Sequence, residues 1–148
     1  MRNSKWDYDE RQMQIAGKLY RRGFLTACII LPLNGLLQGQ GVVWASGFHQ
    51  NFLIMLLLHT ITSFEAILRG VYFGKCNQLN RWAIIGVFGF VSLFLWIVSI
   101  WRLVQGASFL ESNALTSFGF SLVSAAMLTV TAVVGIIKEI MDNRKKAE

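Results

Sequence analysis

The stretch that decides the fold runs from residue 82 to residue 104 and reads WAIIGVFGFVSLFLWIVSIWRLV. It carries one charged residue, Arg102, close to its end. A transmembrane helix needs about 20 consecutive residues of mainly apolar character. Leucine, isoleucine, valine and phenylalanine each favour insertion by about 0.3–0.6 kcal/mol. This stretch therefore predicts a membrane-spanning helix that inserts without help from its neighbours.

Three further stretches have a similar length and apolar character, which gives four predicted spans at about 24–45, 48–69, 82–104 and 115–137. The first is the weakest, because Pro32 removes a helical hydrogen bond and Asn34 interrupts the apolar run. A cleaved signal peptide is the alternative, since Val43 and Ala45 have the spacing of a cleavage site. The long segment of mixed charge before residue 24 argues against that alternative.

The composition agrees with a membrane protein. Of the 148 residues, 54% are hydrophobic and 15% are charged, whereas an average globular protein has about 25% charged residues. We expect one all-α domain over residues 1–148, an integral membrane four-helix bundle. The net charge of +6 does not indicate nucleic acid, because the basic residues flank the apolar spans, where they contact anionic lipid.

The basic residues also predict an orientation. Of the 14 Lys and Arg residues, all but Arg102 lie before the first predicted span, between the second and third, or after the fourth. Cytoplasmic loops carry the excess of Lys and Arg, so both termini are predicted to be cytoplasmic. Residues 1–22 then form an amphipathic cytoplasmic segment, and residues 138–148 form a basic tail. The expected location is the cytoplasmic (inner or plasma) membrane of a bacterium, as a multi-pass protein.

The second span carries an unusual set of polar residues. His59, Thr62 and Glu65 recur every three positions, and Ser63 lies beside them. Polar groups in hydrocarbon usually face the bundle interior and often mark a functional site. One hypothesis is a polar ligand site or proton relay built on His59 and Glu65. The other is structural: Glu65 pairs with Arg69 one turn later, the favoured order for such a pair, and His59 bonds to a neighbouring span.

Motifs for catalysis and metal binding are missing from the sequence. There is no nucleophile motif, P-loop or dinucleotide fingerprint. His49 and His59 have no Cys, Asp or Glu at the spacing of a metal site. The sequence therefore predicts no metal, no cofactor and no enzymatic activity.

The fourth span has small residues at successive i+4 positions, namely Ser117, Ser121, Ala125 and Thr129. Small side chains let helix backbones approach closely, either within a bundle or between two copies. The prediction favours packing within one chain. Gly86 and Gly89 of the third span are candidates to receive this face.

The segment before the first span carries the motif Asp9, Glu10, Arg11 and Gln12, and the second span ends in EAILRGVYF at residues 65–73. With these features the first half of the chain resembles a group of small four-span membrane proteins of Gram-positive bacteria. Members of that group carry an acidic-Arg-Gln motif before the first span. The resemblance implies a regulatory role beside small helix-turn-helix regulators, and it implies no catalytic residue.

Two functions remain open from the sequence. The first is action through protein–protein contacts, as an accessory, regulatory or immunity-type subunit, with segments 1–22 and 74–81 making the contacts. Its partners would be the lipid bilayer and either a membrane or cytoplasmic protein or further copies of the chain. The alternative is a small oligomeric transporter or channel subunit that uses the polar residues of the second span.

Overall fold

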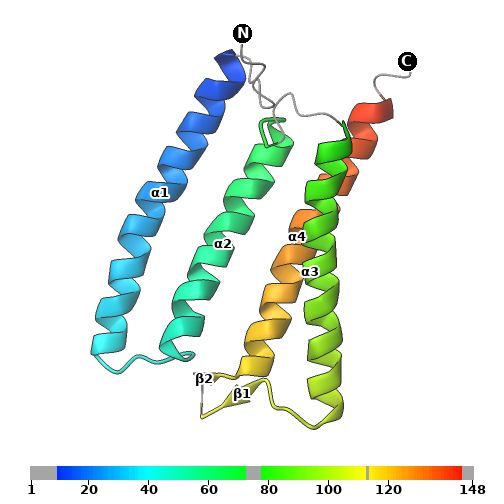
Figure 1. Ribbon diagram of the computed structural model, residues 1–148. Helices are drawn as coiled ribbons and strands as arrows, with labels where there is room; N and C mark the ends of the chain where they lie inside the picture. The colour runs from blue at the N-terminus through cyan, green and yellow to red at the C-terminus, as the bar shows by residue number, and fades with distance from the viewer. Residues whose placement is uncertain (1–9, 73–77, 113, 145–148) are drawn as a thin grey trace.

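The computed structural model describes residues 10–72, 78–112 and 114–144 (Figure 1). Within these residues the chain forms four long helices and one short hairpin. The elements are α1 (Glu10–Gly39), α2 (Gly47–Leu68), α3 (Gln78–Val104), β1 (Leu110–Glu111), β2 (Ala114–Leu115) and α4 (Ser117–Arg144). The prediction of an all-α protein with four packed helices is confirmed. Residues 1–9, which include Asp9, and residues 74–77 of the expected contact segments lie outside the described residues, as do residues 145–148 of the expected basic tail.

Successive helices run in opposite directions, so the start of α1 and the end of α4 lie at the same end of the molecule (Figure 1). In space the packing order differs from the chain order: α1 packs against α2, α2 against α4, and α4 against α3. Helix α1 therefore lies at one edge of the bundle and is held mainly by α2.

Helix α3 exposes most of its apolar residues and buries two serines. Phe90, Leu93 and Ile97 are exposed, whereas Ser92 and Ser99 are buried. A soluble protein rarely exposes so continuous an apolar face, but lipid covers it at no cost. Three helices are long and apolar enough to cross a membrane: α2, α3 from Asn80 to Val104, and α4. The chain is thus a multi-pass membrane protein with three candidate spans among its described residues.

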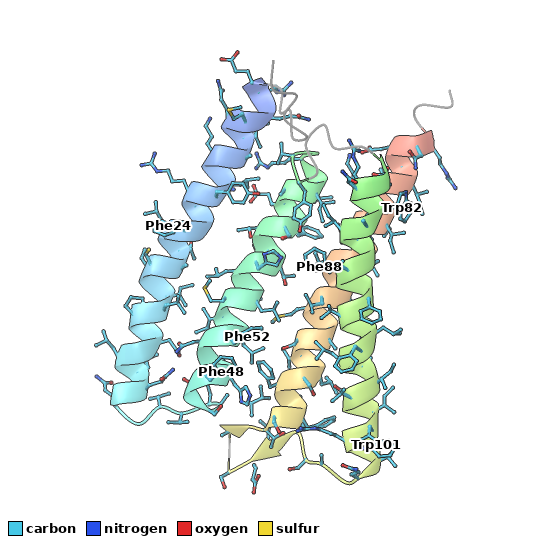
Figure 2. All side chains as sticks on the ribbon, in the orientation of Figure 1. Phe24, Phe48, Phe52, Trp82, Phe88 and Trp101 are labelled. Carbon is cyan, nitrogen blue, oxygen red and sulfur yellow. The ribbon has the colours of Figure 1, made fainter. Side chains whose placement is uncertain are left out.

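The tryptophans of α3 mark the thickness of the apolar layer. Trp82 and Trp101 are exposed near opposite ends of the helix (Figure 2). At 1.5 Å per residue they are about 28 Å apart, close to the ~30 Å of a bilayer's hydrocarbon core. Indole rings favour the membrane–water interface, so both side chains lie where interfacial anchors belong.

Helix α1 is not among the candidate spans. It begins at Glu10 and ends at Gly39, whereas the sequence placed the first span at about 24–45. The physical reason lies in its composition, because four basic residues lie within the helix before Gly23 and the apolar run ends at the polar residues Gln38 and Gln40. The helix stops before the Gln40–Gly41 turn, whereas the predicted span extends to about residue 45.

The small-residue face of α4 lies against α3. Ser121 and Ser99 hydroxyl oxygens are 3.0 Å apart, and those of Thr129 and Ser92 are 2.6 Å apart. The Trp96 indole nitrogen donates to Thr129 Oγ1 at 3.0 Å.

Near the end of α3 and the start of α4, an Arg102 guanidinium nitrogen donates to Ser117 Oγ at 2.6 Å. Gly86 and Gly89 do not receive the α4 face, because both border open space. Ser92 and Ser99, seven residues apart on α3, take that role instead.

The hairpin joins the two loops at the end of the bundle opposite to the start of α1. The Leu115 amide donates to the Trp44 carbonyl at 2.7 Å, which links the α1–α2 connection to β2. Thr116 then caps α4, since its hydroxyl accepts the Gly119 amide at 3.2 Å. At its other end α4 stays helical through Arg144, and the buried Glu139 pairs with Arg81 of α3 at 3.6 Å.

The close contact of α1 with α2 at Gly23 provides a test of the fold. A Cβ atom at Gly23 would lie 2.9 Å from the Thr62 Cγ2 methyl group, whereas one at Gly35 of the same helix would meet nothing. We expect Gly23→Ala to destabilise the protein by about 1–3 kcal/mol through overpacking. Gly35→Ala should be neutral or stabilising by up to about 1 kcal/mol, from helix propensity alone. Unfolding in detergent micelles, followed by tryptophan fluorescence, compares the two, and equal effects would contradict this packing.

Candidate functional site

A cavity of about 250 Å³ lies between α1, α2 and α3, towards the end that holds the start of α1. We call it the α1–α2 cavity. Its walls combine apolar side chains with several polar groups: Ala16, Leu19, Tyr20, His59, Thr62, Ser63, Ala66, Val71, Tyr72 and Ile84. Three of the four polar α2 residues singled out in the sequence, His59, Thr62 and Ser63, thus share one cavity. Sites for small molecules in proteins usually have this mixture of apolar walls and a few polar groups.

One wall of the cavity depends on how α2 ends. Gly70 has a φ of +69°, a backbone conformation that favours glycine. The Val71 amide turns back to the Ala66 carbonyl at 2.9 Å, and the Gly70 amide bonds to the Ile67 carbonyl at 3.0 Å. This is the Schellman arrangement of a helix C-terminus. It folds the chain back so that Val71 is buried and Tyr72 closes the cavity.

A polar network crosses the cavity wall. Ser63 is buried, and its hydroxyl lies 3.3 Å from His59 Nε2 on the same helix. Ser63 is also hydrogen-bonded to the phenol of Tyr72. The His59 ring lies 5.9 Å from that of Phe88, which projects from α3 towards α2 (Figure 2). Ser63 therefore links the α2 histidine to the tyrosine beyond the helix end.

Burial raises the pKa of Tyr72, the hydrogen bond with Ser63 lowers it, and the neighbouring Tyr20 raises it further. Burial has the largest effect, because it disfavours the charged phenolate. The neutral phenol is therefore the form favoured by the fold. This contribution to stability is complete below the ordinary pKa of tyrosine and is lost as the pH rises through the raised value.

Glu65 takes part in a separate ionic cluster. Arg22 of α1 contacts both carboxylate oxygens through Nη2, each at 2.7 Å. Arg69 Nη2 lies 2.6 Å from Glu65 Oε1, so the ion pair with Arg69 predicted from the sequence is present. Arg22 was not predicted to join this pair, because it lies 43 positions from Glu65 and its charge was interpreted only as a signal of membrane orientation. Its pairing with Glu65 fastens α1 to α2.

The polar set of α2 thus divides into two groups with different surroundings. Steps of three residues advance about 300° around a helix, so each member is displaced by about 60° from the one before. Thr62 uses its hydroxyl within α2, on the Leu58 carbonyl at 2.8 Å. No hydrogen bond joins His59 to Glu65 within the part of the chain that the structure describes. The two residues proposed to form a proton relay lie in different clusters.

Three residues of the motif, Glu10, Arg11 and Gln12, lie in the first turn of α1. Glu10 and Arg11 are exposed, and Gln12 Nε2 donates to the Gly70 carbonyl at 3.4 Å. An acidic residue in the first turn also favours the helix dipole, which gives Glu10 a local role. Gln12 ties this turn to the end of α2, so Glu10 and Arg11 are presented on an anchored helix.

A second polar cluster lies at the opposite end of α1. Asn34 is buried, its amide donates to Asn51 Oδ1 at 3.0 Å, and its Oδ1 accepts the Trp44 indole at 3.3 Å. The sequence pointed to Asn34 as an interruption of the apolar run, but not to these partners. Within the residues the structure covers, no group of three or more His, Cys, Asp or Glu could hold a metal ion.

Comparison with protein-family models, with curated proteins and with solved structures returns no match. The class is therefore defined by the fold alone. The chain is a small four-helix membrane protein in which three helices are long and apolar enough to span the bilayer. No family is identified.

The Ser63–Tyr72 contact predicts a measurable titration. In a Tyr8→Phe, Tyr20→Phe background only Tyr72 titrates among the tyrosines. We expect Ser63→Ala to raise the pKa of Tyr72 further, because the hydrogen bond that lowers it is lost. The absorbance of tyrosinate as a function of pH measures this shift. Thr60→Val is the control, since Thr60 bonds only to the Leu56 carbonyl of its own helix; a shift of the same size there would refute the contact.

Proposed function

We propose that this protein is a non-enzymatic accessory or regulatory subunit of a bacterial plasma membrane, which binds a partner protein through the first turn of α1. The observation that carries the proposal is the anchored presentation of Glu10 and Arg11. Both side chains are exposed, whereas Gln12 beside them is fastened to the α2 terminus. Binding loses less conformational entropy when the contact residues are already held in place.

The proposal includes α1 as a fourth span. Helix α1 runs antiparallel to α2, from the Gln12–Gly70 contact near one end to the Asn34–Asn51 contact near the other. A helix that runs alongside a candidate span over this length crosses the same hydrocarbon layer of the membrane. Asn34 supports the proposal, because a polar group in hydrocarbon needs internal partners and Asn34 has two.

It also includes an orientation with both ends in the cytoplasm. Among the described basic residues, all except Arg102 belong to the end of the bundle that holds the start of α1. The excess of Lys and Arg marks the cytoplasmic side. The resemblance to small Gram-positive membrane proteins supports a bacterial plasma membrane and a regulatory partner.

The second candidate is a small oligomeric transporter or channel subunit. It is favoured by the α1–α2 cavity, into which the polar α2 residues His59, Thr62 and Ser63 project. Two features weigh against it. Glu65 is already bound by two arginines, and the packing order places α1 at an edge of the bundle. A path through the membrane would therefore need several copies of the chain.

Affinity purification of the tagged full-length protein from gently solubilised native membranes, with mass spectrometry, tests the proposal. We expect a stoichiometric protein partner. Glu10→Ala with Arg11→Ala should reduce its recovery by roughly ten-fold, which corresponds to about 1.4 kcal/mol of contact energy.

The matched control is Asp142→Ala with Arg144→Ala, which removes one acid and one base from the end of α4 at the same end of the molecule. It should leave recovery unchanged. Equal recovery with both variants would reject docking through α1. A homo-oligomer without a partner would favour the transporter, and loss of solute flux in His59→Ala would then establish it.

A further inference from the structure

A second pocket, of about 410 Å³, lies between α1 and the end of α2. We call it the basic pocket. Two apolar and four basic residues line it: Ile15, Lys18, Leu19, Arg21, Arg22 and Arg69. It shares Leu19 with the α1–α2 cavity, but its polar lining is entirely cationic.

The basic pocket holds an excess of positive charge. Glu65 is the acid in contact with it, and it binds Arg22 and Arg69 together at 2.7 and 2.6 Å. Lys18 and Arg21 form no ion pair with an acid in the described ranges 10–72, 78–112 and 114–144. Four cations against one carboxylate leave an excess of three positive charges. Such a group of like charges favours an anion with several acceptor oxygens.

The depth of the basic pocket suggests the source of that anion. Arg69 caps α2 directly after Leu68, where this candidate span ends. The pocket therefore lies at the level of the lipid headgroups. Basic pockets between transmembrane helices on the cytoplasmic side are known to bind acidic headgroups.

Below the basic pocket, α1 continues with apolar residues on the same face. Lys18, Arg22, Leu25 and Ile29 follow each other at steps of four, three and four residues, which place them along one side of the helix. The side chains of Leu25 and Ile29 are 50% and 67% exposed. A cationic site followed by exposed apolar residues on the same face of α1 matches a phospholipid, with its phosphate at the cations and its acyl chain along the apolar residues.

We propose that the basic pocket binds the phosphate-bearing headgroup of an anionic phospholipid, whose acyl chain lies along Leu25 and Ile29 of α1. Lys18 and Arg21 provide the cations that Glu65 does not engage. Arg22 and Arg69 share their charge between Glu65 and the phosphate. The bound lipid then covers the edge of the bundle where α1 meets α2. This site does not depend on a protein partner at Glu10 and Arg11.

Native mass spectrometry of the full-length protein tests the site. The protein is equilibrated with equal amounts of phosphatidylglycerol and phosphatidylcholine, and the retained lipid is counted after detergent removal. The wild type should retain more phosphatidylglycerol than phosphatidylcholine. Lys18→Gln with Arg21→Gln should reduce that preference, by roughly five-fold for each cation removed. Each single variant should give an intermediate loss.

Lys138→Gln with Arg144→Gln is the control, because it removes two cations at the same end of the molecule but outside the basic pocket. This pair should keep the wild-type preference. An equal loss in both double variants would assign the preference to general surface charge and overturn the proposal. Equal retention of the two lipids by the wild type would also overturn it.

Inorganic phosphate distinguishes a lipid from a free anion at the same cations. An excess of phosphate should leave the bound phosphatidylglycerol in place, because the acyl chain contributes to its retention. Displacement of the lipid by phosphate would mean that the pocket is a simple anion site, and the lipid proposal would be wrong. Lys18 and Arg21 are both exposed, so thermal unfolding of their variants should match the wild type.

Discussion

The structure depends on one constraint: a polar group within the hydrocarbon layer must find its partner in the protein, because no water is there to replace it. The contact between α3 and α4 satisfies this constraint by pairing hydroxyl groups across two helices. Ser92 meets Thr129 and Ser99 meets Ser121, with the apolar side chains turned outward. Each such bond contributes only about 0.6 kcal/mol on average. Together they fix which faces of α3 and α4 meet. Among the described residues three buried polar atoms lack a hydrogen-bond partner, namely Ser124 Oγ, Gln50 Oε1 and Gln38 Nε2.

The same constraint explains how α1 is attached. Its outer face is apolar and exposed, so contact with lipid stabilises that face as much as contact with another helix would. Polar contacts therefore decide its position: Arg22 on Glu65 near one end, and Asn34 with Asn51 and Trp44 near the other. Between these two points Gly23 permits close contact with Thr62. An edge helix held in this way leaves space beside it, and both the α1–α2 cavity and the basic pocket border α1.

The proposed contact surfaces of the protein all border α1. In the proposed membrane orientation the Glu10 and Arg11 turn faces the aqueous side, the basic pocket lies at the headgroup level, and the α1–α2 cavity lies deeper beside α2. A partner protein and an anionic lipid would meet the same helix at different depths. A lipid bound in the basic pocket would therefore stabilise the position of α1, the helix that carries Glu10 and Arg11.

Composition and residue spacing were enough to predict the helical class, the most apolar spans and the polar helix faces that need partners. Residues 82–104 were predicted from apolar length alone, because insertion depends on local composition. The i,i+4 pair of Glu65 and Arg69 followed from helix geometry. Other contacts came to light only in the packed helices. Arg22 joins the Glu65–Arg69 pair, and His59 and Ser63 connect to Tyr72. Ser92 and Ser99 receive the α4 face in place of Gly86 and Gly89. Helix α1 ends at Gly39 because Gln40 and Gly41 form a turn, a feature that apolar length alone does not locate. Local spacing fixes contacts within one helix, whereas contacts between helices depend on rotation and register, which the chain settles only when the four helices pack together.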